Sequence, residues 1–277
     1  RWNMTTDRLY APELVERGTS PSMFRGAEDI AAGDINGDGA VDLVVGASDE
    51  GGINVFLGDG TGKNWQWVDD NLPKRDWTNR VELHDMNGDG KLDIVASFAR
   101  GPRVWLHGDT INQWKTASKG LPSPMVHGLY TGLTAGDVNN DGRLDIAVAN
   151  WVNGPEVFVQ QNSGSWNKMD DVYPDMKGGA QGVALGDLNR DGQLDLAVTG
   201  RLNRNPGYSR GVHLLLGTPH GGWKPLGKTC GLPPTGLAMT PGVELADVNG
   251  DDVLDVAACS GLIVESTSGP KPKRTEP

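Results

Sequence analysis

Oxygen-bearing residues recur in this sequence within a nine-residue segment that has Asp at position 1, Asn at position 3, Asp at position 5 and Asp at position 9. The segments begin at Asp34, Asp85, Asp137, Asp187 and Asp247. Alternate side chains of a tight loop point to one side, and Ca²⁺ takes about six to eight oxygen ligands. Position 6 is Gly in four of the segments, which permits the positive φ of a tight turn. The pattern predicts calcium-binding loops, with up to five calcium ions in all.

In each loop, the expected ligands are the side chains at positions 1, 3, 5 and 9 and the backbone carbonyl at position 7. They are Asp34, Asn36, Asp38, Ala40 and Asp42 in the first loop; Asp85, Asn87, Asp89, Lys91 and Asp93 in the second; Asp137, Asn139, Asp141, Arg143 and Asp145 in the third; Asp187, Asn189, Asp191, Gln193 and Asp195 in the fourth; and Asp247, Asn249, Asp251, Val253 and Asp255 in the fifth.

Two simpler interpretations of the loops compete with calcium binding. Asn-Gly and Asp-Gly pairs also form ordinary hairpin turns, but five copies in one register argue against that. An EF-hand would need a Glu at position 12 and flanking helices, whereas position 12 is apolar here and strand-type residues follow. Asp252 replaces the turn glycine of the fifth loop. Asp tolerates positive φ at a cost, so we expect the weakest binding there.

Charge supports a cation as the partner of these loops. The chain has a formal net charge of −11, which excludes the basic surface that nucleic acid binding needs. Five bound Ca²⁺ ions would bring that charge close to neutrality. Without metal, the clustered carboxylates would repel one another, so we expect calcium to stabilise the fold.

The loops belong to a longer repeat of about 50 residues, with about ten more in the last interval. Short apolar runs precede and follow every loop, and Gly, Asn and Pro bound them, so they predict strands rather than helices. A Trp-bearing segment completes four of the units, at Trp65, Trp114, Trp166 and Trp223. Four short strands per unit predict an all-β fold, a β-propeller of four-stranded antiparallel blades.

The two ends of the chain bear on the number of blades. The fifth unit lacks a Trp segment, while the sequence around Trp2 resembles the one around Trp166. We therefore expect five blades in one domain over residues 1–266, with an N-terminal strand closing the last blade and removing open sheet edges. The alternative is a fragment of a seven-bladed propeller. Residues 267–277 have the Pro/Lys composition of a tail or linker.

The Asp-x-Asn-x-Asp-Gly-x-Leu-Asp loop between two short strands resembles the FG-GAP/VCBS repeat family, which includes integrin α-subunit propellers and fungal lectins. The resemblance covers nearly the whole chain. It implies that the calcium loop joins strands 1 and 2 of each blade. Familiar members of the family have seven blades, and this chain departs from them in showing five repeats.

Fold alone does not decide function. The face opposite the loops varies most between repeats, and aromatic and Arg side chains there could bind sugars. The candidate ligand residues are Trp77, Arg80, Tyr130, Trp151 and Tyr208. The first hypothesis is a binding or adhesion module for a glycan or a surface protein. The alternatives are part of a polysaccharide lyase, or a structural spacer in a larger surface protein. No clustered catalytic constellation is found, so we expect no enzymatic activity.

The expected location of the protein follows from the calcium loops. Loops of this kind need calcium at the concentrations found outside cells, so we expect an extracellular, cell-surface or periplasmic protein. No apolar run is long enough to span a bilayer. Cys230 and Cys259 could pair or remain free thiols. Nothing in the sequence indicates the oligomeric state.

Overall fold

The computed structural model describes residues 26–48, 51–68, 70–122, 129–170, 178–202, 211–219, 222–226 and 242–258. Within these ranges, the regular elements are all β-strands, which form four four-stranded antiparallel sheets and one two-stranded sheet. In the described part of the chain, no helix is long and apolar enough to cross a membrane. The predicted all-β class is confirmed.

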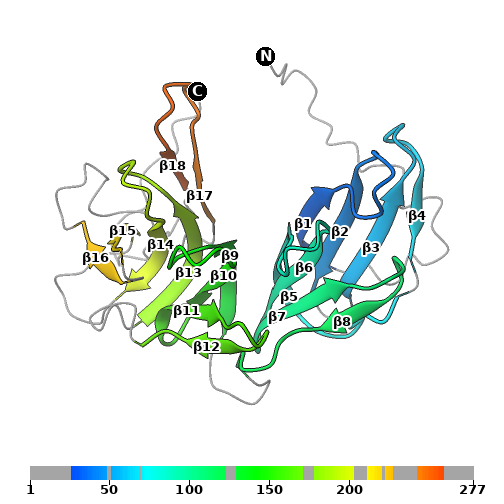
Figure 1. Ribbon diagram of the computed structural model, residues 1–277, viewed down its shortest axis with the longest axis horizontal. Coiled ribbons are helices and arrows are strands. Elements are labelled where there is room, and N and C mark those ends of the chain that lie inside the picture. Colours follow the sequence, from blue (N-terminus) through cyan, green and yellow to red (C-terminus); the bar gives the residue numbers. More distant parts are fainter. Residues whose placement is uncertain are drawn as a thin grey trace, which may run out of the picture.

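Each sheet is one sequence repeat whose strands follow one another in chain order (Figure 1). The first blade contains β1 (Ala27–Gly33), β2 (Asp42–Ala47), β3 (Gly52–Gly58) and β4 (Trp65–Trp67). The second contains β5 (Thr78–His84), β6 (Asp93–Phe98), β7 (Gly101–His107) and β8 (Trp114–Thr116). The third contains β9 (Tyr130–Gly136), β10 (Asp145–Asn150), β11 (Gly154–Gln160) and β12 (Trp166–Lys168). The fourth contains β13 (Gly178–Gly186), β14 (Asp195–Leu202), β15 (Gly211–Gly217) and β16 (Trp223–Pro225). The fifth repeat contributes β17 (Val243–Ala246) and β18 (Asp255–Ala258).

The apolar runs of the sequence are the second and third strands. β6 and β10 are buried along their whole length, because the second and third blades each pack between two others. The Trp segments are the short fourth strands, as predicted. Trp114, Trp166 and Trp223 are buried. The third and fourth strands expected for the fifth repeat, including the closing strand around Trp2, lie outside the described residues. The five-bladed ring therefore stays a prediction.

The hydrophobic core lies between blades. One cluster joins Val44 and Ile53 of the first blade to Ile94 and Phe98 of the second. Similar clusters join the second blade to the third, the third to the fourth, and the fourth to β17 and β18. Every blade therefore shares its core with its neighbours, as expected when sheets pack face to face.

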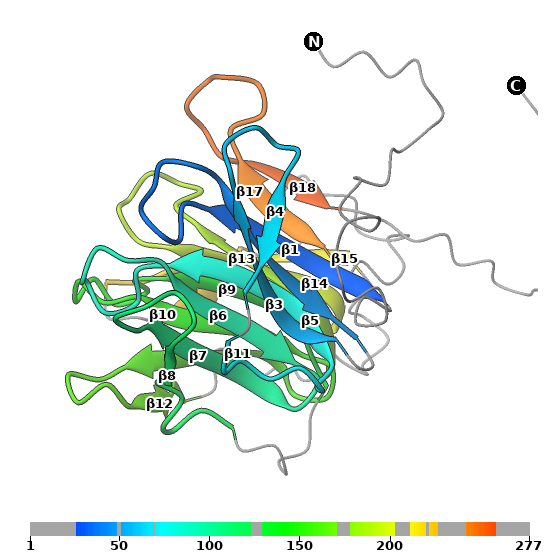
Figure 2. The ribbon, with the colours of Figure 1, turned by 90° about the vertical axis from the view of Figure 1, so that its right-hand side faces the viewer.

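The first strand of each blade is the innermost one. β1, β5, β9, β13 and β17 pack in succession around a common axis. In Figure 2, the loops that join the first and second strands of all the sheets project on the same side of the molecule. The turns between second and third strands, and the connections from one blade to the next, therefore lie at the opposite ends of the strands.

Candidate metal loops and the opposite face

The five acidic loops each connect the first strand of a sheet to the second, which is where the family resemblance places the calcium loop. In the first loop, Asp34 Oδ1 accepts hydrogen bonds from the backbone N–H groups of Gly37 (2.8 Å) and Asp38 (3.1 Å). Asp34 Oδ2 accepts one from Gly39 at 2.8 Å. The Asp at position 1 therefore organises the loop, and the same bonds from positions 5 and 6 recur in the other four loops.

The side chains at positions 3 and 5 also accept hydrogen bonds from backbone N–H groups of the loop. Asn36 Oδ1 accepts the Asp38 N–H at 2.9 Å, beside Asp34 Oδ1, which accepts that same N–H. Asp38 Oδ1 accepts the Ala40 N–H at 2.8 Å, and Asp38 Oδ2 accepts a hydrogen bond from Asn36 Nδ2 at 2.9 Å. The oxygens of positions 1 and 3 thus converge on one amide group, as the alternating pattern predicts.

The turn at position 6 has positive φ in every loop. Its φ is 85° at Gly39 and 63° at Asp252, so the Asp of the fifth loop adopts the left-handed conformation expected for it. Position 4 also has positive φ, including 58° at Asn140 and 62° at Arg190. Position 4 is Gly or Asn in four of the five copies, which is a sequence signal for such a turn, but the prediction concerned position 6 alone.

The Asp at position 9 is buried in the first four loops, unlike the exposed carboxylates of the same loops. Asp93 is fully buried; its Oδ2 accepts the Met86 N–H at 2.8 Å and its Oδ1 accepts the His107 N–H at 2.7 Å. Asp42, Asp145 and Asp195 make the equivalent pair of bonds. This residue therefore ties the loop to the end of the third strand, a role that its place in the motif did not reveal.

Burial raises the pKa of Asp93 to about 6, against an ordinary value of 3.8, and the charges of Asp89 and Asp85 also raise it. Burial likewise raises the pKa of Asp145 to about 6, and it raises that of Asp195. The hydrogen bonds from the backbone amides act in the opposite direction, because they favour the charged carboxylate. Negative charge is thus held at the base of these loops against a desolvation cost.

The chemistry of the loops fits a hard cation, although their carboxylates face backbone amides. Among the described residues, no group of three or more His, Cys, Asp or Glu side chains is arranged closely enough to hold a metal ion. An ionised carboxylate has about four lone-pair sites, so an oxygen that accepts one or two amide hydrogens can still take a further partner. The potential ligands of each loop are all oxygens, which is the set that Ca²⁺ prefers.

Basic residues at position 7 distinguish the second and third loops. Arg143 forms an ion pair with Asp141 of its own loop, and its Nε donates to the Gln160 carbonyl at 3.2 Å. Lys91 instead donates from Nζ to the Gly108 carbonyl at 3.0 Å. The third loop therefore carries an internal counter-charge on one expected calcium ligand.

Exposed aromatic side chains lie at the opposite ends of the strands. Trp77 is 49% exposed and precedes β5, and Trp151 is 38% exposed and follows β10. The Trp77 carbonyl accepts the Ala99 N–H at 3.0 Å, and the Leu129 carbonyl accepts the Trp151 N–H at 2.9 Å. Trp77 and Leu129 therefore occupy equivalent positions in neighbouring blades, as do Ala99 and Trp151.

The other candidate ligand residues have different locations. Tyr130 is 2% exposed and donates from its hydroxyl to the buried Glu156 at 2.9 Å. Burial and the charge of Glu156 raise the pKa of Tyr130 above its ordinary range. Tyr130 is thus a core residue, and the expectation that it faces a ligand is corrected. Tyr208, Cys230 and Cys259 lie outside the described residues.

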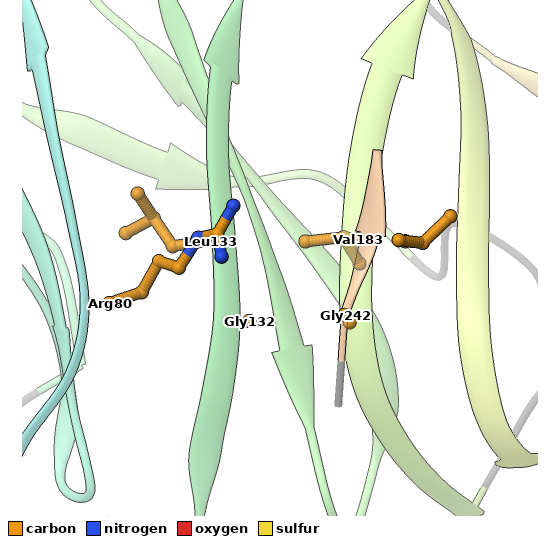
Figure 3. A pocket seen from close by; sticks show the side chains of 7 residues that line it. Arg80, Gly132, Leu133, Val183 and Gly242 are labelled. Carbon is orange, nitrogen blue, oxygen red and sulfur yellow. The ribbon is translucent and has the colours of Figure 1, made fainter. Parts of the chain in front are cut away.

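Arg80 lies on the axis rather than on the outer face. It forms ion pairs with Asp29 of β1, at 3.5 Å, and with Glu244 of β17. Together with Gly132, Gly182 and Gly242 it lines a small pocket where the innermost strands meet (Figure 3). Arg80 therefore connects strands from three repeats, and the expectation that it binds a ligand on the face of Trp77 and Trp151 is corrected.

Comparison with known proteins agrees with this architecture. Residues 34–96 and 137–198 each match the FG-GAP-like repeat, and each match includes two acidic loops. No curated protein matches the sequence. The fold is similar to that of an Agrocybe aegerita lectin, described for its specific recognition of non-reducing terminal N-acetylglucosamine, with a TM-score of 0.51 and 18% sequence identity. The similarity covers 82% of this chain and 59% of the lectin chain, so this chain spans less than two thirds of that protein.

Proposed function

Because this chain is a β-propeller that matches the FG-GAP-like repeat over residues 34–96 and 137–198, we propose that it is a calcium-stabilised binding module that recognises a glycan with the face opposite its acidic loops. One observation carries the glycan assignment: Trp77 and Trp151 expose their rings at the same ends of adjacent blades. Flat aromatic surfaces present a large apolar contact area at low entropic cost, and sugar rings have apolar faces that stack on them. The similarity to a lectin supports the proposal at the level of the fold.

The proposed calcium sites are the five acidic loops. Their expected ligands are the oxygens at positions 1, 3 and 5, with the carbonyl at position 7 and the Asp at position 9. Bound calcium would supply positive charge to loops that otherwise carry unbalanced carboxylates. Loops that offer only five protein ligands bind calcium weakly, so we also propose an extracellular, cell-surface or periplasmic location.

Thermal unfolding tests the calcium sites. A ligand that binds only the folded state raises its stability by mass action, so the melting temperature should rise as calcium replaces chelator. Asp34→Ala should reduce that rise, because it removes a ligand at position 1. Asp109→Ala is a matched control, since Asp109 is an exposed Asp in a turn outside the loops. Equal melting temperatures in calcium and in chelator would show that the loops do not bind the ion.

Glycan-array binding tests the opposite face. We expect Trp77→Ala and Trp151→Ala to weaken binding to the recognised glycans while leaving the melting temperature nearly unchanged, because both rings are exposed. Val248→Ala is the control, since Val248 is an exposed apolar residue on the side of the acidic loops. If the wild-type protein in calcium binds no glycan, the glycan assignment is wrong, whatever the result of the calcium test.

A further inference from the structure

At the end of the second blade that lies opposite its acidic loop, an aromatic ring lies near positively charged side chains. The Trp77 carbonyl accepts the Ala99 N–H, which places Trp77 beside the two-residue turn that joins β6 to β7. The second residue of that turn is Arg100, which is exposed. The chain has a net charge of −11, so an exposed Arg beside an exposed Trp gives this part of the surface a positive charge that most of the molecule lacks.

A second guanidinium group lies behind this turn. Arg103 donates from Nη1 to the carbonyls of Pro102 (2.7 Å) and Pro122 (2.9 Å). A Cβ built on Gly101 would lie 3.4 Å from that Nη1. The guanidinium group of Arg103 therefore lies beside the turn that contains Arg100. With Nη1 anchored, Nε and Nη2 of Arg103 make no hydrogen bond to a described residue. This edge of a guanidinium group has the geometry that binds a carboxylate through two parallel hydrogen bonds.

The carboxylate of Asp76 is the acidic group whose charge acts on Arg103. Its Oδ1 accepts the Trp77 N–H at 2.9 Å, which fixes the backbone of Trp77. Within the described ranges, neither Arg100 nor Arg103 forms an ion pair with an acidic side chain. An anionic ligand that contacts Trp77 would meet the exposed Arg100 and the partly buried Arg103 at the same turn.

The third blade has the opposite charge at the corresponding place. Glu156 occupies the position of Arg103, is 3% exposed, and is balanced by Lys168 Nζ at 2.7 Å and the Tyr130 hydroxyl at 2.9 Å. An acidic ligand would thus be favoured at the second blade and not at the third, although both carry an exposed Trp.

We propose that Trp77, Arg100 and Arg103, which we call the Trp77 patch, bind a sugar residue that carries a carboxylate group. The sugar ring stacks on Trp77, and its carboxylate pairs with the two guanidinium groups. This inference rests on the proposed glycan-binding function and specifies the ligand class for one part of that face.

The test uses the full chain in calcium and two kinds of carboxylated probe, oligogalacturonate and sialyllactose, each against its carboxyl-reduced counterpart. We expect at least one acidic probe to bind about tenfold more tightly than its reduced form, because the reduced form lacks the carboxylate that pairs with the guanidinium groups. The two probes distinguish a uronic acid from a sialic acid as the source of the carboxylate.

Variants assign the binding to the patch. Arg100→Gln should remove most of the preference for the acidic probe, and Trp77→Ala should weaken binding of the acidic probe and of any reduced form that binds. Arg103→Lys keeps the charge but loses the paired hydrogen bonds, so it should also weaken binding. Lys115→Gln, which removes an exposed cation of β8 outside the patch, should leave binding of the acidic probe unchanged.

Equal affinity for acidic and reduced probes, or an undiminished preference in Arg100→Gln, would overturn this inference. If neutral glycans then bind in a manner that depends on Trp151, the proposed function stands and only the acidic specificity fails. If no glycan binds at all, both proposals fail. Arg100 and Trp77 are exposed, so their variants should fold, and this can be checked by their melting temperatures.

Discussion

At the scale of single residues, the buried Asp at position 9 links the acidic loops to the blades. In the second blade, Asp93 accepts one amide hydrogen from the loop and one from the end of β7. Its charge is retained at a desolvation cost, which is why its pKa lies above the ordinary Asp value. The position therefore joins two parts of the chain that sequence comparison alone would treat as separate.

This raised pKa predicts how stability depends on pH in the absence of calcium. An Asp with a pKa of about 6 in the folded state and 3.8 in the unfolded state binds more protons when folded, so its contribution falls as pH rises between these values. Asp93→Asn removes this titration. In chelator, the unfolding free energy of the wild type relative to Asp93→Asn should therefore decrease from about pH 4 to pH 7. Chemical denaturation at several pH values measures it, and an increase over this range would contradict the prediction.

The ligand pattern of the loops was accessible to sequence analysis because it depends on residues close together in the chain. Asp34 and Asn36, whose side chains accept the same Asp38 N–H, are two positions apart in one turn. Tyr130 and Arg80 show where this approach ends. Tyr130 is buried because Glu156, in another strand, accepts its hydroxyl, and Arg80 is drawn to the axis by Asp29 and Glu244 from other repeats. Neither set of partners can be found without the fold.

At the scale of elements, the innermost strands of adjacent blades approach so closely that some positions have no room for a side chain. A Cβ built on Gly132 of β9 would lie 2.8 Å from the Gly182 Cα and 2.9 Å from the Gln181 carbonyl oxygen of β13. Both are backbone atoms, so the strands would have to move apart. The strands themselves were predicted from their apolar runs, but this contact was not, because it is made between repeats.

We therefore expect Gly132→Ala to destabilise the protein by about 1–3 kcal/mol, as overpacking of a tight contact does. Denaturant unfolding measures the loss. Gly179→Ala of β13 is the matched control, because the nearest atom to its Cβ is the Trp151 carbonyl oxygen at 3.4 Å, an ordinary van der Waals contact. Equal stability of Gly132→Ala and wild type would mean that the blades accommodate the methyl group by a small shift.

At the scale of the whole molecule, Arg80 connects the first described repeat to the last. It belongs to β5 and pairs with Asp29 on β1 and with Glu244 on β17. Gly132 of β9, Gly182 of β13 and Gly242, which precedes β17, line the small pocket beside it. One cation thus balances carboxylates that are far apart in the sequence. The two ion pairs restrain the ends of the described arc of blades relative to each other.

Arg80→Met keeps much of the volume and removes the charge, so it should lower the unfolding free energy by about 1–2 kcal/mol, a modest amount because Glu244 is mostly exposed and screened by solvent. The loss should shrink at high salt, which already screens the pairs. Lys115→Met, at an exposed cation of β8, is the control. A loss of stability that does not depend on salt would assign the role of Arg80 to packing instead.

The placement of the core between blades has a consequence for how such a molecule can change over generations. A repeat with two neighbours contributes one face to the core that it shares with each of them, and these shared cores are built from equivalent positions of neighbouring repeats. Duplication or deletion of one complete repeat in the gene would therefore replace one core between blades by another of the same kind. A partial duplication would leave an apolar face without a partner. The chain is thus free to vary in length by whole repeats, while the rims of individual blades, such as those of Trp77 and Trp151, diverge separately.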